Sequence, residues 1–291
     1  THLWDIENLD ASYSYNEFNH RDFVNKENLR KNYRAALGYN YITSPKFYSP
    51  LQKRIKNNTL ALLRDVNFNL LPSLLNFRIE VDRLYSENSL RNNNDPTNFI
   101  PVNTTFNKNF LINRLYGISW DLTKSLKLDF NATNLGVVDE PEGRITGLKR
   151  DTLLQNLKKL GRTTDYNHTL NLSYTVPLNK IPGLDFIGLI TRYQTNFNWR
   201  SEPLITLDNP DINFGNSIQN QRTIQINPTL NFVNLYNKFG FYKRITVVDS
   251  TKKTTLAESF LKALLSLKNI SGNYTKNEGT FLPGYLPQTQ I

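Results

Sequence analysis

The chain has 291 residues, of which 35 are Lys or Arg and 25 are Asp or Glu, so its formal net charge is +10. It contains no cysteine, which excludes a disulfide-stapled domain and any cysteine-ligated metal site. No stretch approaches about 18 consecutive apolar residues, which excludes a helical membrane protein, and the 17 Phe and 15 Tyr argue against disorder.

The basic residues are spread along the chain. No run of Lys or Arg exceeds three residues, so we interpret them as solvated loop residues and expect no nucleic-acid partner. The chain begins at Thr1 without a methionine. We expect either that processing removed its start or that it is an internal piece of something longer.

Period-2 alternation of apolar and polar residues is the strongest pattern, and it predicts about ten β-strands. In chain order, the strands are expected at 9–16, 30–42, 60–69, 74–86, Phe110–Leu122, Leu126–Thr133, Tyr166–Val176, Ile187–Trp199, 221–236 and 265–276. The two strands on either side of Thr123–Ser125 are expected to form a hairpin. The sequence therefore indicates an all-β, antiparallel protein.

The expected strands are long, mostly 10–16 residues, whereas ordinary sheet strands average about 5–6. At about 3.4 Å per residue and a tilt of about 45°, 11 residues rise about 26 Å, enough for the apolar band of an outer-membrane barrel. Short and long connections also alternate, as in barrels whose short turns all lie on one side. The expected short connections are Leu70–Ser73, Thr123–Ser125 and Pro177–Asp185, and the long ones are Glu87–Thr105, Val138–Thr164 and Ser201–Asn220.

Each clear strand has one apolar and one polar face. If the strands span a membrane, the apolar side chains are expected to face lipid and the polar ones a water-filled lumen. The expected lipid-facing residues are Phe110, Ile112, Ile118, Trp120, Leu126, Leu128, Phe130, Leu170, Leu172, Leu189 and Trp199. The expected lumen-lining residues are Asn113, Ser119, Lys127, Asp129, Asn131, Asn167, Asn171, Arg192, Gln194, Asn196 and Asn198. This mixed, amide-rich set would not strongly select one ion.

Two segments interrupt the strand pattern with helical spacing. Leu153, Leu154 and Leu157 predict a short helix near 152–160 that stops at Gly161. A second series predicts a helix near 255–267. We expect both helices to pack on loops or a plug rather than to anchor the chain on a membrane.

Little in the sequence points to chemistry. The histidines His2, His20 and His168 share no metal-ligand spacing, and no nucleophile-elbow or phosphate-binding motif occurs. The acidic group at Asp139, Glu140 and Glu142 flanks Pro141 and Gly143, which is turn chemistry. We therefore expect no enzyme, no catalytic or metal site and no cofactor.

The aromatic residues fall near the ends of the expected strands. Trp120 comes just before a short turn and Trp199 ends a strand before a long loop. The tyrosines Tyr13, Tyr15, Tyr39 and Tyr41 are also near strand ends. Interfacial aromatic girdles place rings there, although Tyr and Trp favour strands in any sheet.

Nine segments spread along the chain, most of them strand ends and turns, resemble a known family. They are WDIEN at Trp4–Asn8, SYSYNE at Ser12–Glu17, LTKSLK at Leu122–Lys127, GRTTDYN at Gly161–Asn167, YTVPLNKIP at Tyr174–Pro182, GNSIQN at Gly215–Asn220, NLYNK at Asn234–Lys238, KNISGNY at Lys268–Tyr274 and GTFLPG at Gly279–Gly284. In type and order these segments resemble the SprA/Sov family of type IX secretion translocons.

The resemblance implies a transmembrane antiparallel β-barrel in the bacterial outer membrane, of about 36 strands in all. Residues 1–291 would be one segment of that barrel, supplying about ten strands. The family exports folded cargo proteins with a C-terminal secretion signal to the cell surface and is tied to gliding motility. Its implied partners are outer-membrane lipid, a PorV-like partner barrel and a periplasmic plug protein, the last two closing a lateral opening.

Two alternatives stay open at this point. The chain could be a complete small porin or a piece of a TonB-dependent receptor, and pairing between the first and last strands would favour self-closure. It could instead be a soluble extracellular β-sandwich, acting as an adhesin or glycan-binding module. A sandwich predicts that apolar faces are buried against each other.

Overall fold

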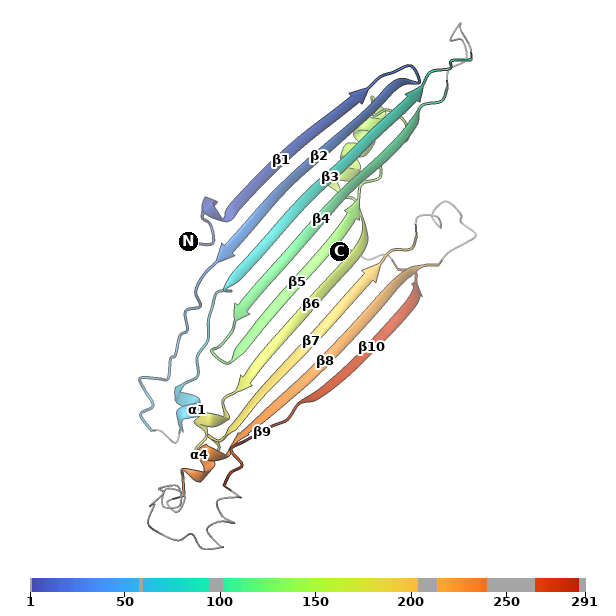
Figure 1. Ribbon diagram of the computed structural model, residues 1–291. Coiled ribbons are helices and arrows are strands. Elements are labelled where there is room, and N and C mark those ends of the chain that lie inside the picture. The colour runs from blue at the N-terminus through green and yellow to red at the C-terminus, as the bar shows by residue number, and fades with distance from the viewer. Residues whose placement is uncertain (1, 58–59, 95–101, 204–213, 240–264, 288–291) are drawn as a thin grey trace, which may run out of the picture.

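A single antiparallel sheet of ten strands makes up most of the computed structural model, which describes residues 2–57, 60–94, 102–203, 214–239 and 265–287 (Figure 1). The strands are β1 (Leu9–His20), β2 (Asn25–Ile42), β3 (Leu74–Leu90), β4 (Thr105–Asp121), β5 (Leu126–Val137), β6 (Arg162–Val176), β7 (Ile187–Arg200), β8 (Asn216–Asn231), β9 (Asn269–Ser271) and β10 (Tyr274–Tyr285). The all-β prediction is confirmed.

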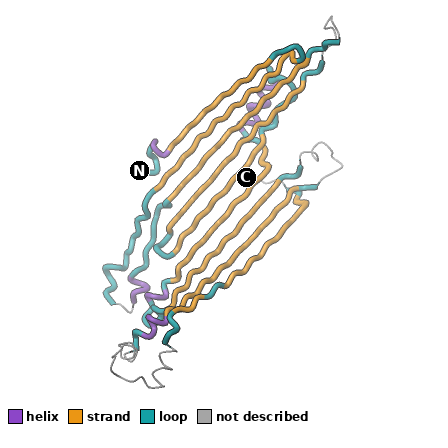
Figure 2. Tube along the Cα trace, viewed as in Figure 1, coloured by secondary structure: helices purple, strands orange, loops and turns teal. Residues whose placement is uncertain are grey.

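The strands follow one another across the sheet in chain order, ending β7-β8-β10, with the short β9 also paired to β8. β1 and β10 therefore form the two opposite edges, and the sheet is open (Figure 2). All residues of β1 are exposed, as are nearly all of β10. A barrel that this chain closes by itself would pair these two strands, and the described sheet does not.

The expected hairpin is confirmed: β4 and β5 pair from Asp121 opposite Lys127 up to Leu111 opposite Val137. The expected strand at 60–69 is wrong. That stretch holds the one-turn helix α1 (Ala61–Arg64), because β2 pairs directly with β3 and leaves 43–73 as their connection. Leu70–Ser73 is consequently not a hairpin turn.

Two further boundaries differ from expectation at the C-terminal side. β8 stops at Asn231, whose side chain accepts a hydrogen bond from the Asn234 amide and starts helix α4 (Phe232–Tyr236). The expected strand at 265–276 is divided into β9 and β10 on either side of Gly272. A capping asparagine and a glycine thus end strands that the alternation of apolar and polar residues predicts to continue.

The helix near 152–160 is confirmed as α2 (Leu148–Lys158). Just beyond its end, Gly161 adopts a positive φ of 71°, and a Cβ there would lie 2.7 Å from the Val137 carbonyl oxygen. Glycine is required for this close return to the sheet. The helix expected near 255–267 lies almost entirely outside the described residues. No described helix has both the length and the apolarity to cross a membrane.

The connections sort by length only in part. We call the end of the sheet where β1 finishes the upper end. The connections there are 21–24, 91–104, 138–161 and 201–215, and those at the lower end are 43–73, 122–125, 177–186 and 232–268. The expected alternation holds from β3 to β8. It fails nearer the N-terminus, where the upper turn is short and the lower connection long, and again after β8, where the lower connection 232–268 is long.

Candidate functional site: the two faces of the sheet

The expected lumen residues of β4 to β7 all lie on one face of the sheet, which we call the polar face. The register aligns Ser119, Asp129, Asn171 and Gln194 in one row across four strands. Parity places the other expected lumen residues on the same face, because alternate side chains point the same way. Neighbours bond across strands: Ser119 Oγ donates to Asp129 at 2.5 Å, and Thr169 Oγ1 donates to Asn196 at 2.9 Å.

The opposite face, which we call the apolar face, carries all the expected lipid-facing residues. One row across it reads Trp120, Leu128, Leu172 and Tyr193. On β7 it runs from Leu189 to Trp199, and the ten residue steps between them rise about 24 Å at a tilt of about 45°. That height matches the apolar band of about 25 Å on membrane barrels.

Aromatic rings mark both ends of this band on β6 and its neighbours. At the upper end, the His168 ring stacks on Phe197 with centroids 5.2 Å apart, and Tyr166 pairs with Trp199 in the register. At the lower end, Trp120 Nε1 donates a hydrogen bond to the Asn69 carbonyl at 3.0 Å. Trp120 thus meets a polar group at the lower boundary of the apolar face, whereas Trp199 Nε1 and His168 Nδ1 are buried without a hydrogen-bond partner in the described part of the chain.

The upper part of the apolar face is covered by the protein itself. Ile112 is 0% exposed and Phe110 6%, and both pack with Val138 and Leu153 in a small core. The expectation that Phe110 and Ile112 face lipid is therefore wrong. The reason is length: β3 and β4 extend beyond the upper end of β5, and the chain after β5 folds back over them. The same expectation is wrong for Trp199, which is 4% exposed between its register neighbours Tyr166 and Ile218.

Residues 138–147 cross this extension as a strap tied by ion pairs, which we call the clasp. Arg83 Nε and Nη2 donate to Glu140 at 2.6 and 2.8 Å, and the Glu140 side chain is only 2% exposed. Lys108 Nζ donates to the Pro141 carbonyl at 2.6 Å. A buried carboxylate needs such partners, because an unpaired charge there would be strongly destabilising. Glu140, expected only in a turn, thus has a structural role.

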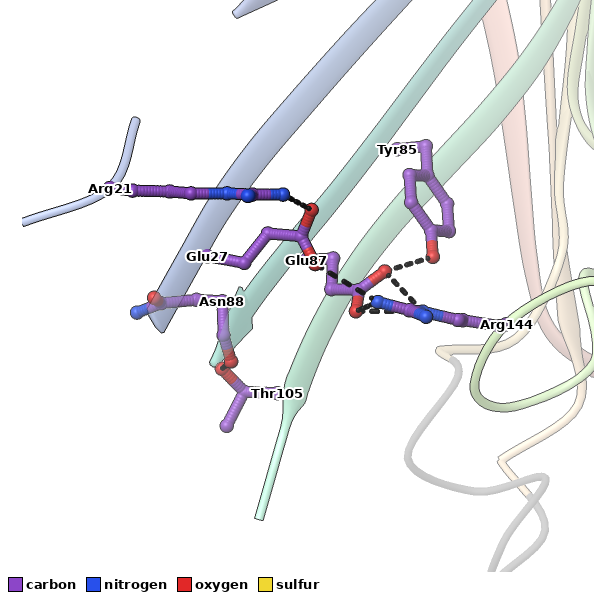
Figure 3. A network of polar contacts seen from close by, with 7 residues as sticks. All are labelled: Arg21, Glu27, Tyr85, Glu87, Asn88, Thr105 and Arg144. Carbon is purple, nitrogen blue, oxygen red and sulfur yellow. Dashed lines mark hydrogen bonds and ion pairs between the residues drawn. The ribbon is translucent and has the colours of Figure 1, made fainter. Parts of the chain in front are cut away.

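A second set of ion pairs holds the far end of the clasp (Figure 3). Arg144 donates to Glu87 at 2.6 to 3.0 Å and to Glu27 at 3.1 Å, and Arg21 reaches Glu27 at 3.2 Å. Tyr85 donates to Glu87 at 2.9 Å. The hydrogen bonds that Arg144 donates to Glu87 raise the pKa of the Arg144 guanidinium. β3 therefore supplies a cation, Arg83, to Glu140 of the clasp and an anion, Glu87, to Arg144 of the clasp.

The apolar face does not continue across the C-terminal edge. On that face, Arg222 of β8 pairs in the register with Glu278 of β10, and its Nε donates to the Glu278 carboxylate at 3.0 Å. Lys276 lies 2.5 Å from the same carboxylate. Thr195 of β7 is the register neighbour of Arg222. Three charges therefore stand on the face that is apolar one strand earlier.

No chemical site emerges within the described residues. No group of three or more potential metal ligands occurs among them. His168 lies in the aromatic cluster, and His20 bonds Asp22 at 3.0 Å. Comparison with protein-family models and with curated proteins gave no match for this chain.

Proposed function

We propose that this chain is a wall segment of a large outer-membrane β-barrel that conducts folded proteins to the cell surface, as a SprA/Sov-type translocon. The observation that carries the proposal is the division of one continuous long-stranded sheet into an apolar face of membrane height and an amide-rich polar face. An antiparallel sheet in a lipid bilayer needs this division.

The open edges support a segment rather than a complete barrel. β1 and β10 each present 12 residues along an unpaired edge. An unpaired edge of this length is a ready template for pairing, so we expect further strands to continue the sheet on both sides. Residues 1–291 are then one part of a single large barrel, and the self-closed porin is the weaker candidate.

The polar face supports a wide, water-filled passage. Its central part on β6, β7 and β8 is built from amides and hydroxyls such as Asn171, Gln194, Asn196 and Gln221, with few charges. Such a surface is hydrated and offers no strong site for cargo to bind. Cargo with a C-terminal secretion signal would pass along it, and a PorV-like barrel or a periplasmic plug protein would gate the passage.

The soluble sandwich is less well supported. A sandwich needs a second sheet against the apolar face, and the described residues form one sheet, with only α2 and the clasp over its upper part. The band from Tyr174 to Leu170 on β6 has no such cover.

Single cysteines can test the proposal, because the chain has none of its own. Leu170→Cys and its neighbour Asn171→Cys, each in the full-length protein in its native membrane, place a probe on opposite faces. We expect a fluorophore at 170 to be quenched by brominated lipid, and the thiol at 171 to react with a water-soluble maleimide. The reverse pattern, or equal behaviour at both sites, would overturn the proposal.

A further inference from the structure

We propose that α2 binds the phosphate headgroups of anionic lipids in the leaflet at the upper end of the sheet. This inference rests on the proposed function, because it needs the apolar face to lie in a bilayer. It assigns to the 138–161 connection a task beyond covering the extension of β3 and β4.

The position of α2 is fixed by its inner side. Leu153 is buried against Phe110 and Ile112, and Leu157 packs beside it. The clasp holds the preceding residues through Glu140 and Arg144, so the helix has little freedom to leave the sheet. α2 therefore lies over the upper ends of β3 and β4, where the uncovered apolar band stops (Figure 1).

The outer side of α2 is basic. The side chains of Arg150, Lys158 and Lys159 are exposed, and none has an ion-pair partner within the described part of the chain. Lys149 instead donates to the Glu142 carbonyl at 2.6 Å. Glu142 and Asp151 lie towards the N-terminal half of the helix, and Asp139, whose carbonyl accepts from Asn156 near the other end, has its carboxylate 3.5 Å from Arg162 Nε. Lys158 and Lys159 are thus two adjacent free cations.

Exposed leucines accompany these cations. Leu148 is 84% exposed and Leu154 is also exposed, although leucine gains nothing from water. A lipid satisfies both features, because its phosphate pairs with lysine while its glycerol and upper acyl region receive leucine. A nucleic acid or a free anion would leave the leucines unmatched.

The level of the helix agrees with this occupant. Tyr166, on the apolar face at the upper end of the band and only partly buried, is a ring type that marks the headgroup region. β5, which ends at Val137, leads directly from the band into the clasp and then into α2. Lysines beside such a belt meet the headgroups when the band meets the acyl chains.

The test uses the full-length protein in neutral detergent, with a polarity-sensitive dye on Gln155→Cys in α2. Short-chain phosphatidylglycerol is titrated against phosphatidylcholine and against inorganic phosphate. We expect tighter binding of phosphatidylglycerol, and a roughly thirtyfold loss in Lys158→Gln/Lys159→Gln, because each lysine near an anionic surface contributes severalfold. Lys53→Gln/Arg54→Gln, an exposed adjacent pair at the lower end, is the matched control and should bind normally.

Equal affinity for the two lipids, equal binding of inorganic phosphate, or an equal loss in the control would each overturn the inference. Its failure is distinct from failure of the proposed function. If brominated lipid quenches the probe at position 170 but α2 shows no lipid preference, the headgroup inference is wrong and the proposed function stands. If brominated lipid does not quench the probe at position 170, the proposed membrane barrel is wrong.

Discussion

The apolar face differs between the central strands β4 to β7 and the C-terminal edge formed by β8 and β10. In the centre, Leu128, Leu172 and Tyr193 continue one another across the register. At the edge, Arg222 and Glu278 occupy the same face. The polar face of β8 carries Gln and Thr, and on its other face Asn220 and Arg222 interrupt a series that continues with Ile224 and Ile226.

This difference shows that the length and pairing of a strand do not alone decide whether its faces contact lipid or water. Both regions have long antiparallel strands in one sheet, yet only the centre has an unbroken apolar row across its strands, from Trp120 through Leu128 and Leu172 to Tyr193. A charged group costs about 2–4 kcal/mol at the bilayer midplane. We therefore expect lipid contact to end at β7.

Arginine substitutions on the apolar face should give the largest difference in stability between the two regions. Leu128→Arg, in the central band, should reduce the free energy of unfolding of the membrane-inserted protein by about 2–4 kcal/mol. Thr280→Arg, on the same face of β10, should change it by less than about 0.5 kcal/mol, since charges already stand there. Urea titration of the membrane-inserted protein gives both values. Equal losses would mean that both regions face lipid, and no loss at either would mean that the faces are inverted.

The clasp should be the next most sensitive feature. Glu140→Gln leaves Arg83 without its carboxylate under a covered surface and should destabilise residues 138–161 by about 2 kcal/mol. Hydrogen exchange should rise in that segment and stay unchanged in β6 and β7. Glu142→Gln, an exposed neighbour, is the matched control. An equal increase for both variants would assign the effect to net charge and not to the ion pair.

Replacing the Glu278 carboxylate, which Arg222 and Lys276 share, tests whether the C-terminal edge is exposed to water. Glu278→Gln should reduce stability only slightly, because a solvent-screened ion pair contributes little. In hydrocarbon the same change would leave Arg222 and Lys276 as unpaired cations and would cost several kcal/mol. Chemical denaturation separates the two cases, and a large loss would show that the edge is not wet.

Much of the central sheet could be predicted from its sequence, and the physical reason is local. Alternation on Phe110–Leu122 and Leu126–Thr133, with a turn between them, defines a hairpin without distant information. The stretch at 60–69 misled because its apolar residues have the density of a strand but no pairing partner except one isolated bridge at Phe68. Pairing is a property of two segments, and one segment alone does not reveal it.

The clasp could not be predicted, because its ion pairs join residues far apart in the chain, 57 positions for Arg83–Glu140 and Arg144–Glu87 and 117 for Arg144–Glu27. Nothing local distinguishes Glu140 from its acidic neighbours in the turn. The charge at the C-terminal edge left a clearer signal. Arg222 lies at a position whose alternate neighbours, Ile224 and Ile226, are apolar, and a charge in such a series marks a change in what the face meets.

At the lower end, two ion pairs link the central strands to their flanks, and their pH dependence gives the smallest expected effect. Hydrogen bonds from Arg64, and then from Lys180, lower the pKa of Asp65, and one from Lys238 lowers the pKa of Asp185. Lys238 follows β8, so the second pair joins the edge to the β6–β7 connection. A carboxyl whose pKa is lowered on folding stabilises the fold above its ordinary pKa of about 4 and loses that contribution as the pH falls.

Proteolysis of the lower connections should therefore accelerate below about pH 4 and stay constant between pH 5 and pH 8. Asp185→Asn should raise the rate at pH 7 and flatten its pH dependence near 177–186, while cleavage near 43–73 should respond only to Asp65→Asn. The matched upper segment, 138–161, reports whether acid acts on the whole sheet. If all three segments loosen together, the lower ion pairs do not join the edge to the centre independently, and the two regions unfold as one unit.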